Sequence, residues 1–194
     1  MKDSLQKILD EQFYEPIKYK DIPNKKLLVG FSSLPLAGRT ILADKIVEKF
    51  KAVHFNKDTA RTLIYQNEKI NDVQEVEDVL DEYMEIVFDR LRNLPNGLVI
   101  VDASIDRNYD KYKEWAGKNG YSMYIIGLET DRNIIEERIR KNKDLETAKW
   151  FLVQMDRWEN DNKKFNSQHK CDFYIKNNDE KKSEELLIDL ENHI

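Results

Sequence analysis

The sequence has only one cysteine, Cys171, among its 194 residues. A single thiol cannot form an intrachain disulfide or a thiolate metal site, so both are excluded. The three histidines are scattered and lack the spacing of metal ligands. No apolar run approaches the length that spans a membrane, and the N-terminus lacks the apolar core of a signal peptide. We therefore expect a soluble cytoplasmic protein with no membrane partner.

The charge balance lacks a strong excess of either sign. Charged residues make up 36% of the chain and the net charge is −5, which predicts a well-solvated surface. This balance gives no global attraction to nucleic acid or to an anionic membrane, but it does not exclude a local basic patch. With 40% hydrophobic residues, the chain can bury one sizeable core, and a single domain is the simplest expectation.

Short apolar runs alternate with stretches of helical periodicity along the chain. The predicted strands are residues 27–31, 52–55, 98–101, 122–128 and 171–175. The predicted helices are residues 5–13, 41–47, one that begins near residue 58, 76–94, 108–118, 131–143, 146–165 and 183–192. This alternation is typical of an α/β protein with a parallel sheet covered by helices on both faces. Ligands of such sheets bind beyond the carboxyl ends of the strands.

The segment KLLVGFSSLPLAGRT, residues 26–40, carries the strongest functional signal. An apolar strand leads into a short loop, and a helix begins at its end. The pattern to compare is G-x-x-x-x-G-K-[ST], in which loop amides and the helix N-terminus bind phosphate. The predicted phosphate-binding residues are Ser33, Leu34, Pro35, Leu36, Ala37, Gly38, Arg39 and Thr40. The alternative is an ordinary strand-to-helix connection with no ligand.

Two positions of this loop depart from the pattern. Ser33 stands where the pattern has glycine, and Arg39 stands where it has lysine. Serine is the milder change, whereas arginine keeps the charge but replaces a compact ammonium with a broad planar fork. Gly38 lets the backbone approach an oxyanion closely, and Thr40 has a hydroxyl that could bind a magnesium ion. We predict that Arg39 neutralises phosphate charge in place of the lysine.

Asp102 comes directly after the apolar run 98–101. An acid beyond a central strand could orient a magnesium ion through water, or it could face the substrate together with Ser104 and Asp106. The alternative is that Asp102 caps the next loop through its own backbone.

Asp58 and Arg61 follow the second predicted strand, and their i, i+3 spacing places both on one helix face. The carboxylate could accept a proton from an acceptor hydroxyl while the guanidinium binds a neighbouring phosphate. The alternative is equally physical: Asp58 caps the helix and Arg61 is solvated.

Arg138 and Arg140 lie on the charge-dense helix predicted at 131–143. Cationic side chains that close over a triphosphate would stabilise the charge of the transferring group. The alternative is that this helix simply exposes its charged residues to solvent, as most charge-dense helices do. On the next predicted helix, aromatic and Met side chains recur at helical spacing, which favours core packing over base stacking. They are Trp150, Phe151, Met155 and Trp158.

Taken together, these motifs resemble the small P-loop kinases, the group with polynucleotide kinase, chloramphenicol phosphotransferase, gluconate kinase and the zeta toxins. S-L-P-L-A-G-R-T resembles their phosphate-binding loop, Asp58-x-x-Arg61 their acceptor-side D-x-x-R, and residues 101–104 the end of their third strand. The resemblance implies a three-layer fold with sheet order 2-3-1-4-5, ATP and Mg²⁺ as cofactors, and Asp58 as general base. It also implies a helical lid at about 131–166, whose arginines, here Arg138 or Arg140, contact phosphates. It covers residues 26–194 and leaves residues 1–25 as an N-terminal helix and connector.

The leading hypothesis is an ATP-dependent phosphotransferase that acts on a hydroxyl of a small molecule, with nucleotide and acceptor as partners. Thr40 and, indirectly, Asp102 would hold magnesium. The substitution at Arg39 motivates a second hypothesis, a nucleotide-binding regulatory module with impaired catalysis. A kinase of nucleic-acid 5′ ends is a third, which the acidic composition disfavours. The acceptor and the oligomeric state stay open.

Overall fold

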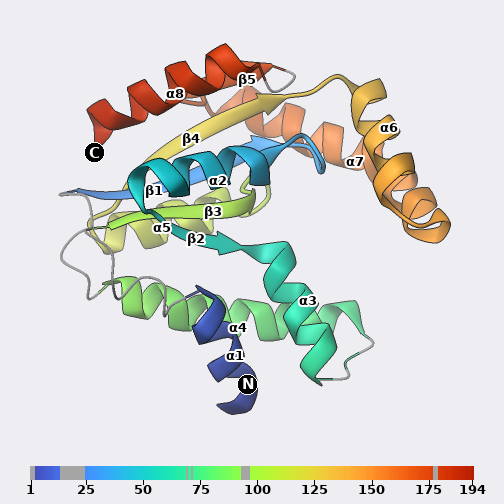
Figure 1. The fold of residues 1–194 in the computed structure, drawn as a ribbon, viewed down its shortest axis with the longest axis horizontal. Coiled ribbons are helices and arrows are strands. Elements are labelled where there is room, and N and C mark those ends of the chain that lie inside the picture. Colours follow the sequence, from blue (N-terminus) through green and yellow to red (C-terminus); the bar gives the residue numbers. More distant parts are fainter. Residues whose placement is uncertain (1–2, 14–24, 69, 71, 93–96, 177–178) are drawn as a thin grey trace.

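Five parallel strands form one sheet at the centre of the molecule (Figure 1). The structure is a computed structural model that describes residues 3–13, 25–68, 70, 72–92, 97–176 and 179–194. In spatial order the strands are β2 (Val53–Asn56), β3 (Gly97–Ser104), β1 (Lys26–Ser33), β4 (Ser122–Glu129) and β5 (Phe173–Lys176). The fold class and the order 2-3-1-4-5 expected from the sequence are confirmed.

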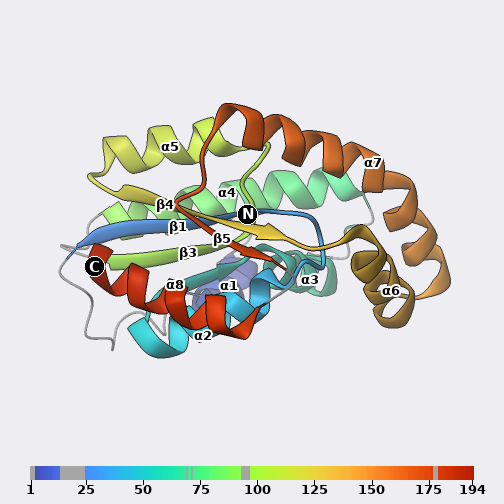
Figure 2. The ribbon, with the colours of Figure 1, turned by 90° about the horizontal axis from the view of Figure 1, so that it is seen from above.

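Helices cover both faces of the sheet (Figure 2). Helices α2 (Arg39–Phe50) and α8 (Glu180–His193) lie on one face. Helices α4 (Val73–Arg92), α5 (Tyr109–Lys118) and the C-terminal part of α7 (Leu145–Gln168) lie on the other. Successive side chains of a strand point to opposite faces, so Leu27 and Val29 of β1 pack with α2 while Leu28 packs on the opposite side. This is why the strands read as continuous apolar runs.

Helix α1 (Asp3–Phe13) packs into the same core as the sheet. Leu5, Leu9 and Phe13 are at most 5% exposed, and the Phe13 ring lies 5.2 Å from that of Phe55 on β2. Asp10 accepts hydrogen bonds from Arg90 of α4. The predicted helix 5–13 is therefore present and contributes to the core. The division into residues 1–25 and 26–194 stays a prediction, and residues 14–24 lie outside the described residues.

Helix α6 (Arg132–Asn142) and the start of α7 project beyond the carboxyl ends of the strands (Figure 1). They have a small core of their own, formed by Ile135, Ile139, Ala148 and Met155. Leu34 and Leu36 of the loop after β1 pack against it. The aromatic stripe of α7 contributes Phe151 and Trp158, but Trp150 is 54% exposed. Core packing was therefore the wrong expectation for Trp150, because it lies on the outer side of a projecting helix.

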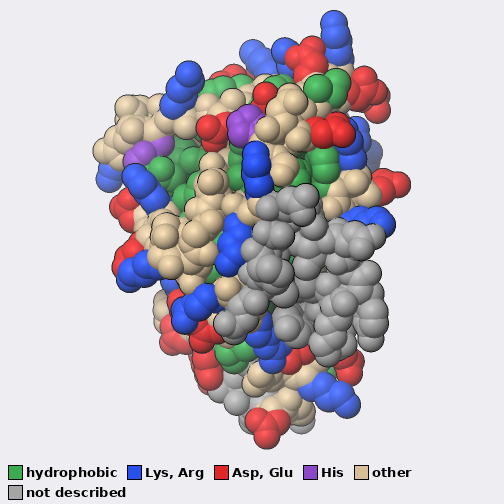
Figure 3. Space-filling view, turned by 90° about the vertical axis from the view of Figure 1, so that its left-hand side faces the viewer, with side chains coloured by type: hydrophobic (Ala, Val, Ile, Leu, Met, Phe, Trp, Pro, Cys, Tyr) green, Lys and Arg blue, Asp and Glu red, His purple; other side chains and the backbone are tan. Residues whose placement is uncertain are grey.

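The other expected elements differ from the observed ones by a few residues. Helix α3 (Lys57–Glu68) follows β2 directly, and β3 continues through Asp102 to Ser104. The expected end of the long helix at 94 lies outside the described residues. None of the helices in the described part of the chain is long and apolar enough to span a membrane. At the end of the molecule where the strands begin, acidic and basic side chains are interspersed over the described surface (Figure 3).

Candidate functional site: the loop between β1 and α2

The loop after β1 has two residues with positive φ, Leu36 and Gly38, and leads directly into a helix N-terminus. Gly38 has φ 106°, in the left-handed region that favours glycine, and it directly precedes α2. The N-cap residue, Gly38, has no side chain that could cap α2, so this residue leaves the first amides and the positive end of the helix dipole unused. Leu36 also has a positive φ, 59°, which costs a non-glycine residue on the order of 1–2 kcal/mol. Such strain is typical of functional turns.

Two side chains that lie later in the sequence donate hydrogen bonds to backbone carbonyls of this loop. Arg138 of α6 donates from Nη1 to the carbonyl of Leu36 at 2.9 Å. Thr130 donates to the carbonyl of Ala37 at 3.2 Å. The loop is therefore held from the side of α6, and Arg138 brings a positive charge to it. Arg140, in contrast, pairs with Glu136 and is 60% exposed at its side chain, so the structure brings only one of the two predicted lid arginines to the loop.

Arg39 connects the loop to the end of β3. Its side chain is 14% exposed, and its Nε lies 3.5 Å from Oδ1 of Asp102. Nη1 donates a hydrogen bond of 3.4 Å to the hydroxyl of Ser33. The two residues that depart from the common phosphate-loop pattern are thus in direct contact, which the sequence alone did not indicate.

Asp102 is the most enclosed acid of the site, at 2% exposed. Asn56 of β2 donates to its Oδ2 at 2.6 Å, and Nε2 of His54 lies 3.3 Å from the same oxygen. Burial by itself would raise the pKa of Asp102. Hydrogen bonds from His54 and Thr40 and the charge of Arg39 outweigh burial, and the pKa is lowered. Asp102 is therefore a carboxylate at neutral pH, and side chains rather than its own backbone are its partners.

Thr40 and Asp102 fit the requirements of a magnesium ion. Magnesium prefers oxygen ligands and is usually held by one or two protein groups together with substrate phosphates and water. The Thr40 hydroxyl lies within hydrogen-bonding reach of Asp102, and Oδ1 of Asp102 is buried without a hydrogen-bond partner. In the described part of the chain no group of three or more His, Cys, Asp or Glu could hold a metal alone. A metal ion here would therefore take its remaining ligands from water or from a bound molecule.

Asp58 and Arg61 lie in the first turns of α3. Thr59 donates its backbone N–H to Oδ1 of Asn56 at 2.8 Å, so Asn56 caps this helix and Asp58 does not. The Asp58 side chain is 74% exposed and pairs with Arg61. Burial by itself would lower the pKa of Arg61, but hydrogen bonds and charges from Glu77 and Asp58 outweigh it and raise the pKa. Neither residue has the structural role that the sequence left open as an alternative.

A second polar network lies beside the loop and was not expected from the sequence. Asn162 of α7 donates hydrogen bonds of 2.9 Å to Ser32 of β1 and to Oδ2 of Asp106. Burial raises the pKa of Asp106 despite hydrogen bonds from Asn162, Ser32 and Ser104. This network links α7 to the base of the loop. The signal that could have indicated it was the buried polar Ser32, which follows the apolar part of β1 from Leu27 to Phe31.

No protein-family model and no curated protein sequence matches the chain. Solved structures do match it. One, from the PezAT chromosomal toxin–antitoxin system of Streptococcus pneumoniae, is 16% identical with a TM-score of 0.60, covering 91% of this chain and 77% of its own. A protein from Chloroflexus aurantiacus proposed to be a kinase is 10% identical with a TM-score of 0.59, covering 88% and 96%. Shikimate kinase from Aquifex aeolicus is 14% identical with a TM-score of 0.50, covering 86% and 96%. The chain thus has the fold of the P-loop kinases, and the structural resemblance to them is confirmed.

Proposed function

We propose that the protein is an ATP-dependent phosphotransferase that acts on a hydroxyl group of a small molecule. The observation that carries the proposal is the loop from Ser33 to Thr40. It joins a left-handed glycine to a helix N-terminus without a side-chain cap, and Arg39 and Arg138 both contact it. Backbone amides and guanidinium groups at one point are suited to the phosphates of a nucleotide. The P-loop kinase fold supports the same activity.

In the proposed reaction the acceptor oxygen forms a bond to the γ-phosphorus of ATP. The bond from this phosphorus to the bridging oxygen breaks, and the bridging oxygen keeps the electron pair and leaves with ADP. The acceptor proton passes to Asp58. Bound Mg²⁺, held by Thr40 and through water by Asp102, would neutralise phosphate charge. The residues supply positioning and charge, which provide most of the catalysis in phosphoryl transfer.

Three residues have assigned roles around this step. Asp58 is exposed, takes no part in capping and is held in orientation by Arg61, as a general base for a bound acceptor requires. Arg39 neutralises phosphate charge from between Ser33 and Asp102. Arg138 contributes charge from the lid. Arg140 stays a prediction of the sequence, because it would have to leave Glu136 to reach a phosphate.

The proposal is tested by comparing Asp58→Asn with Asp110→Asn, a matched control that also changes an acid in the first turn of a helix. Both variants should bind Mg·ATP like the wild type in calorimetry, because neither position contacts the loop. Transfer of labelled γ-phosphate into a small-metabolite extract should fall about 10²- to 10⁴-fold for Asp58→Asn alone, the usual range for loss of a general base. Equal transfer by both variants would disprove the role of Asp58. Absence of nucleotide binding by the wild type would overturn the proposed function.

A further inference from the structure

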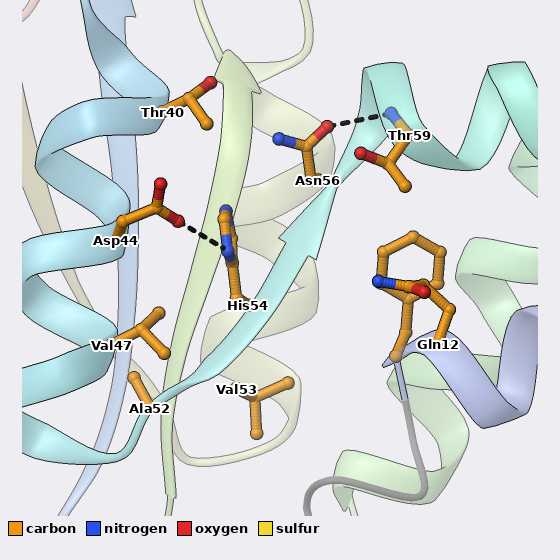
Figure 4. A pocket seen from close by; sticks show the side chains of 10 residues that line it. Gln12, Thr40, Asp44, Val47, Ala52, Val53, His54, Asn56 and Thr59 are labelled. Atoms are coloured by element: carbon orange, nitrogen blue, oxygen red, sulfur yellow. Dashed lines mark hydrogen bonds and ion pairs between the residues drawn. The ribbon is translucent and has the colours of Figure 1, made fainter.

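The ring of His54 on β2 lies between two carboxylates. Its Nε2 is 3.3 Å from Oδ2 of Asp102, the buried acid near the end of β3. Its Nδ1 is 3.6 Å from Oδ1 of Asp44, which lies on α2 one turn after Thr40 and has a side chain that is 67% exposed (Figure 4). Strand β2 therefore places an imidazole between the helix that follows the loop and the acid of the candidate magnesium site, which consists of Thr40 and Asp102.

The hydrogen bond between His54 and Asp102 has one possible direction. Burial alone would raise the pKa of Asp102, but hydrogen bonds from His54 and Thr40 outweigh it and lower the pKa. Asp102 is therefore ionised at neutral pH, and the oxygens of a carboxylate can accept but not donate. The proton must be on Nε2 of His54. On the other side of the ring, the 3.6 Å between Nδ1 and Asp44 is longer than a hydrogen bond.

The two oxygens of Asp102 have different surroundings. Oδ2 accepts from His54 and, at 2.6 Å, from the side-chain amide of Asn56. Oδ1 is buried without a hydrogen-bond partner among the described residues and lies 3.5 Å from Nε of Arg39. Rotation of a carboxylate about its last single bond is only weakly restricted by itself. Two donors on one oxygen oppose this rotation and keep the other oxygen on the side of the loop.

His54 also separates Asp102 from solvent. A cavity of about 370 Å³ lies beside β2, and His54, Asn56 and Thr40 are among the residues that line it (Figure 4). Asp102 is not among the described residues of its wall, and its side chain is 1% exposed, whereas that of His54 is 19% exposed. Without the ring, water from the cavity would reach Oδ2. The higher local dielectric would then weaken the attraction between Asp102 and a cation.

We propose that His54 is a positioning residue of the candidate magnesium site, which holds the Asp102 carboxylate in the orientation that an ion beside Thr40 requires. This inference rests on the proposed function and adds a residue that no motif of the sequence indicated. The role requires an N–H donor at the place of Nε2 and does not require a charged ring. Residues that orient metal-binding groups typically change metal affinity by about 10- to 100-fold. Because Asp102 would act on the ion through water, we expect an effect of about tenfold.

The test measures how strongly Mg²⁺ promotes nucleotide binding. Calorimetry gives the affinity of each protein for a non-hydrolysable ATP analogue with Mg²⁺ and again with EDTA, and the ratio of these affinities reports the metal site. In His54→Leu the ratio should fall about tenfold, while the affinity in EDTA stays within about twofold of the wild type. His54→Gln places an amide N–H near the position of Nε2 and should keep most of the ratio. The matched control is His193→Leu, which removes a histidine 3.7 Å from Asp189 on α8 and should leave both affinities unchanged.

The outcomes separate a positioning role from a structural one. If His54→Leu lowers the affinity by the same factor with Mg²⁺ and with EDTA, the ring supports only the fold and the inference is wrong. If His54→Gln loses as much of the ratio as His54→Leu, or neither loses any, the donor has no part in metal binding. If His54→Leu shows no cooperative urea transition, His54→Asn replaces it. The asparagine amide takes the place of Nδ1 and is too short to reach Asp102, so the ratio should fall there too, and an unchanged ratio would overturn the inference.

The wild type separates this inference from the proposed function. If it binds the analogue equally well with Mg²⁺ and with EDTA, the positioning role is wrong although the nucleotide site stands. If it binds the analogue under neither condition, the proposed function fails and the role of His54 fails with it.

Discussion

Replacing Arg39 by lysine restores the common residue of phosphate-binding loops, yet the structure predicts that it harms this protein. The guanidinium of Arg39 contacts Ser33 through Nη1 at 3.4 Å and faces Asp102 through Nε at 3.5 Å. A lysine has one ammonium group on a narrower stem and cannot bridge both partners. If it keeps its charge near Asp102, the hydroxyl of Ser33, which is 3% exposed, loses its donor.

The size of the effect follows from the long Ser33 contact. A hydrogen bond of ordinary strength contributes about 0.5–1.5 kcal/mol, and 3.4 Å places this one at the low end. We therefore expect Arg39→Lys to reduce the free energy of unfolding by about 0.5 kcal/mol. In a Ser33→Gly background the same change should cost less, because no hydroxyl is left without its partner. The expected coupling energy between the two positions is about 0.5 kcal/mol.

Urea unfolding of the wild type, both single variants and the double variant measures this coupling. Calorimetry with Mg·ATP on the same proteins should show that Arg39→Lys weakens binding and that the double variant recovers part of the loss. If the effects of the two substitutions on the free energy of unfolding are additive, Ser33 and Arg39 do not interact. A gain of ATP hydrolysis by Arg39→Lys alone would refute the reasoning and favour the hypothesis of a regulatory module with impaired catalysis.

Three further predictions follow from single positions. Gly38→Ala should destabilise the protein by about 1–2 kcal/mol in urea unfolding and weaken ATP binding in calorimetry, because φ 106° is unfavourable for a side chain; an unchanged affinity would contradict the role of this turn. Asp106→Asn should raise the melting temperature at pH 7, because burial raises the folded pKa of Asp106 above its ordinary 3.8 and the ionised form is therefore destabilising. The gain should shrink as the pH falls through the folded pKa toward about 4, where the wild-type acid is protonated, and a gain independent of pH would exclude this cause. Leu9→Ala should cost about 2–5 kcal/mol in a single unfolding transition, since Leu9 is 0% exposed; a separate early transition would show that α1 unfolds independently.

The sheet and the loop could be predicted from the sequence because their signals are local. Strand β1 is an apolar run from Leu27 to Phe31 whose residues pack on both faces of the sheet, and buried parallel strands have this composition. The loop was visible because Gly38 and Thr40 keep the spacing of a known pattern. Both inferences use residues that are close in sequence, where propensity and backbone geometry act directly.

The partners of the site residues could not be predicted, because they depend on contacts across the sheet. Asn56 lies opposite Asp102 through the register of β2 and β3, and His54 shares its face because side chains two apart in a strand point the same way. Charge density on α6 also could not separate Arg138 from Arg140. Positions two apart on a helix differ by roughly 200°, so only one of them could face the loop.

Asn56 shows how one cross-strand contact decides the interpretation of a neighbouring residue. From the sequence, Asp58 was as plausible a helix cap as a general base. The side-chain oxygen of Asn56 already accepts from the Thr59 amide, while its nitrogen donates to Asp102. The same side chain therefore caps α3 and fixes the distance between the start of this helix and Asp102, the acid of the candidate phosphate site. Because the cap is provided by Asn56, the exposed carboxylate of Asp58 has no structural role in the described contacts apart from Arg61, and this leaves it available for an acceptor.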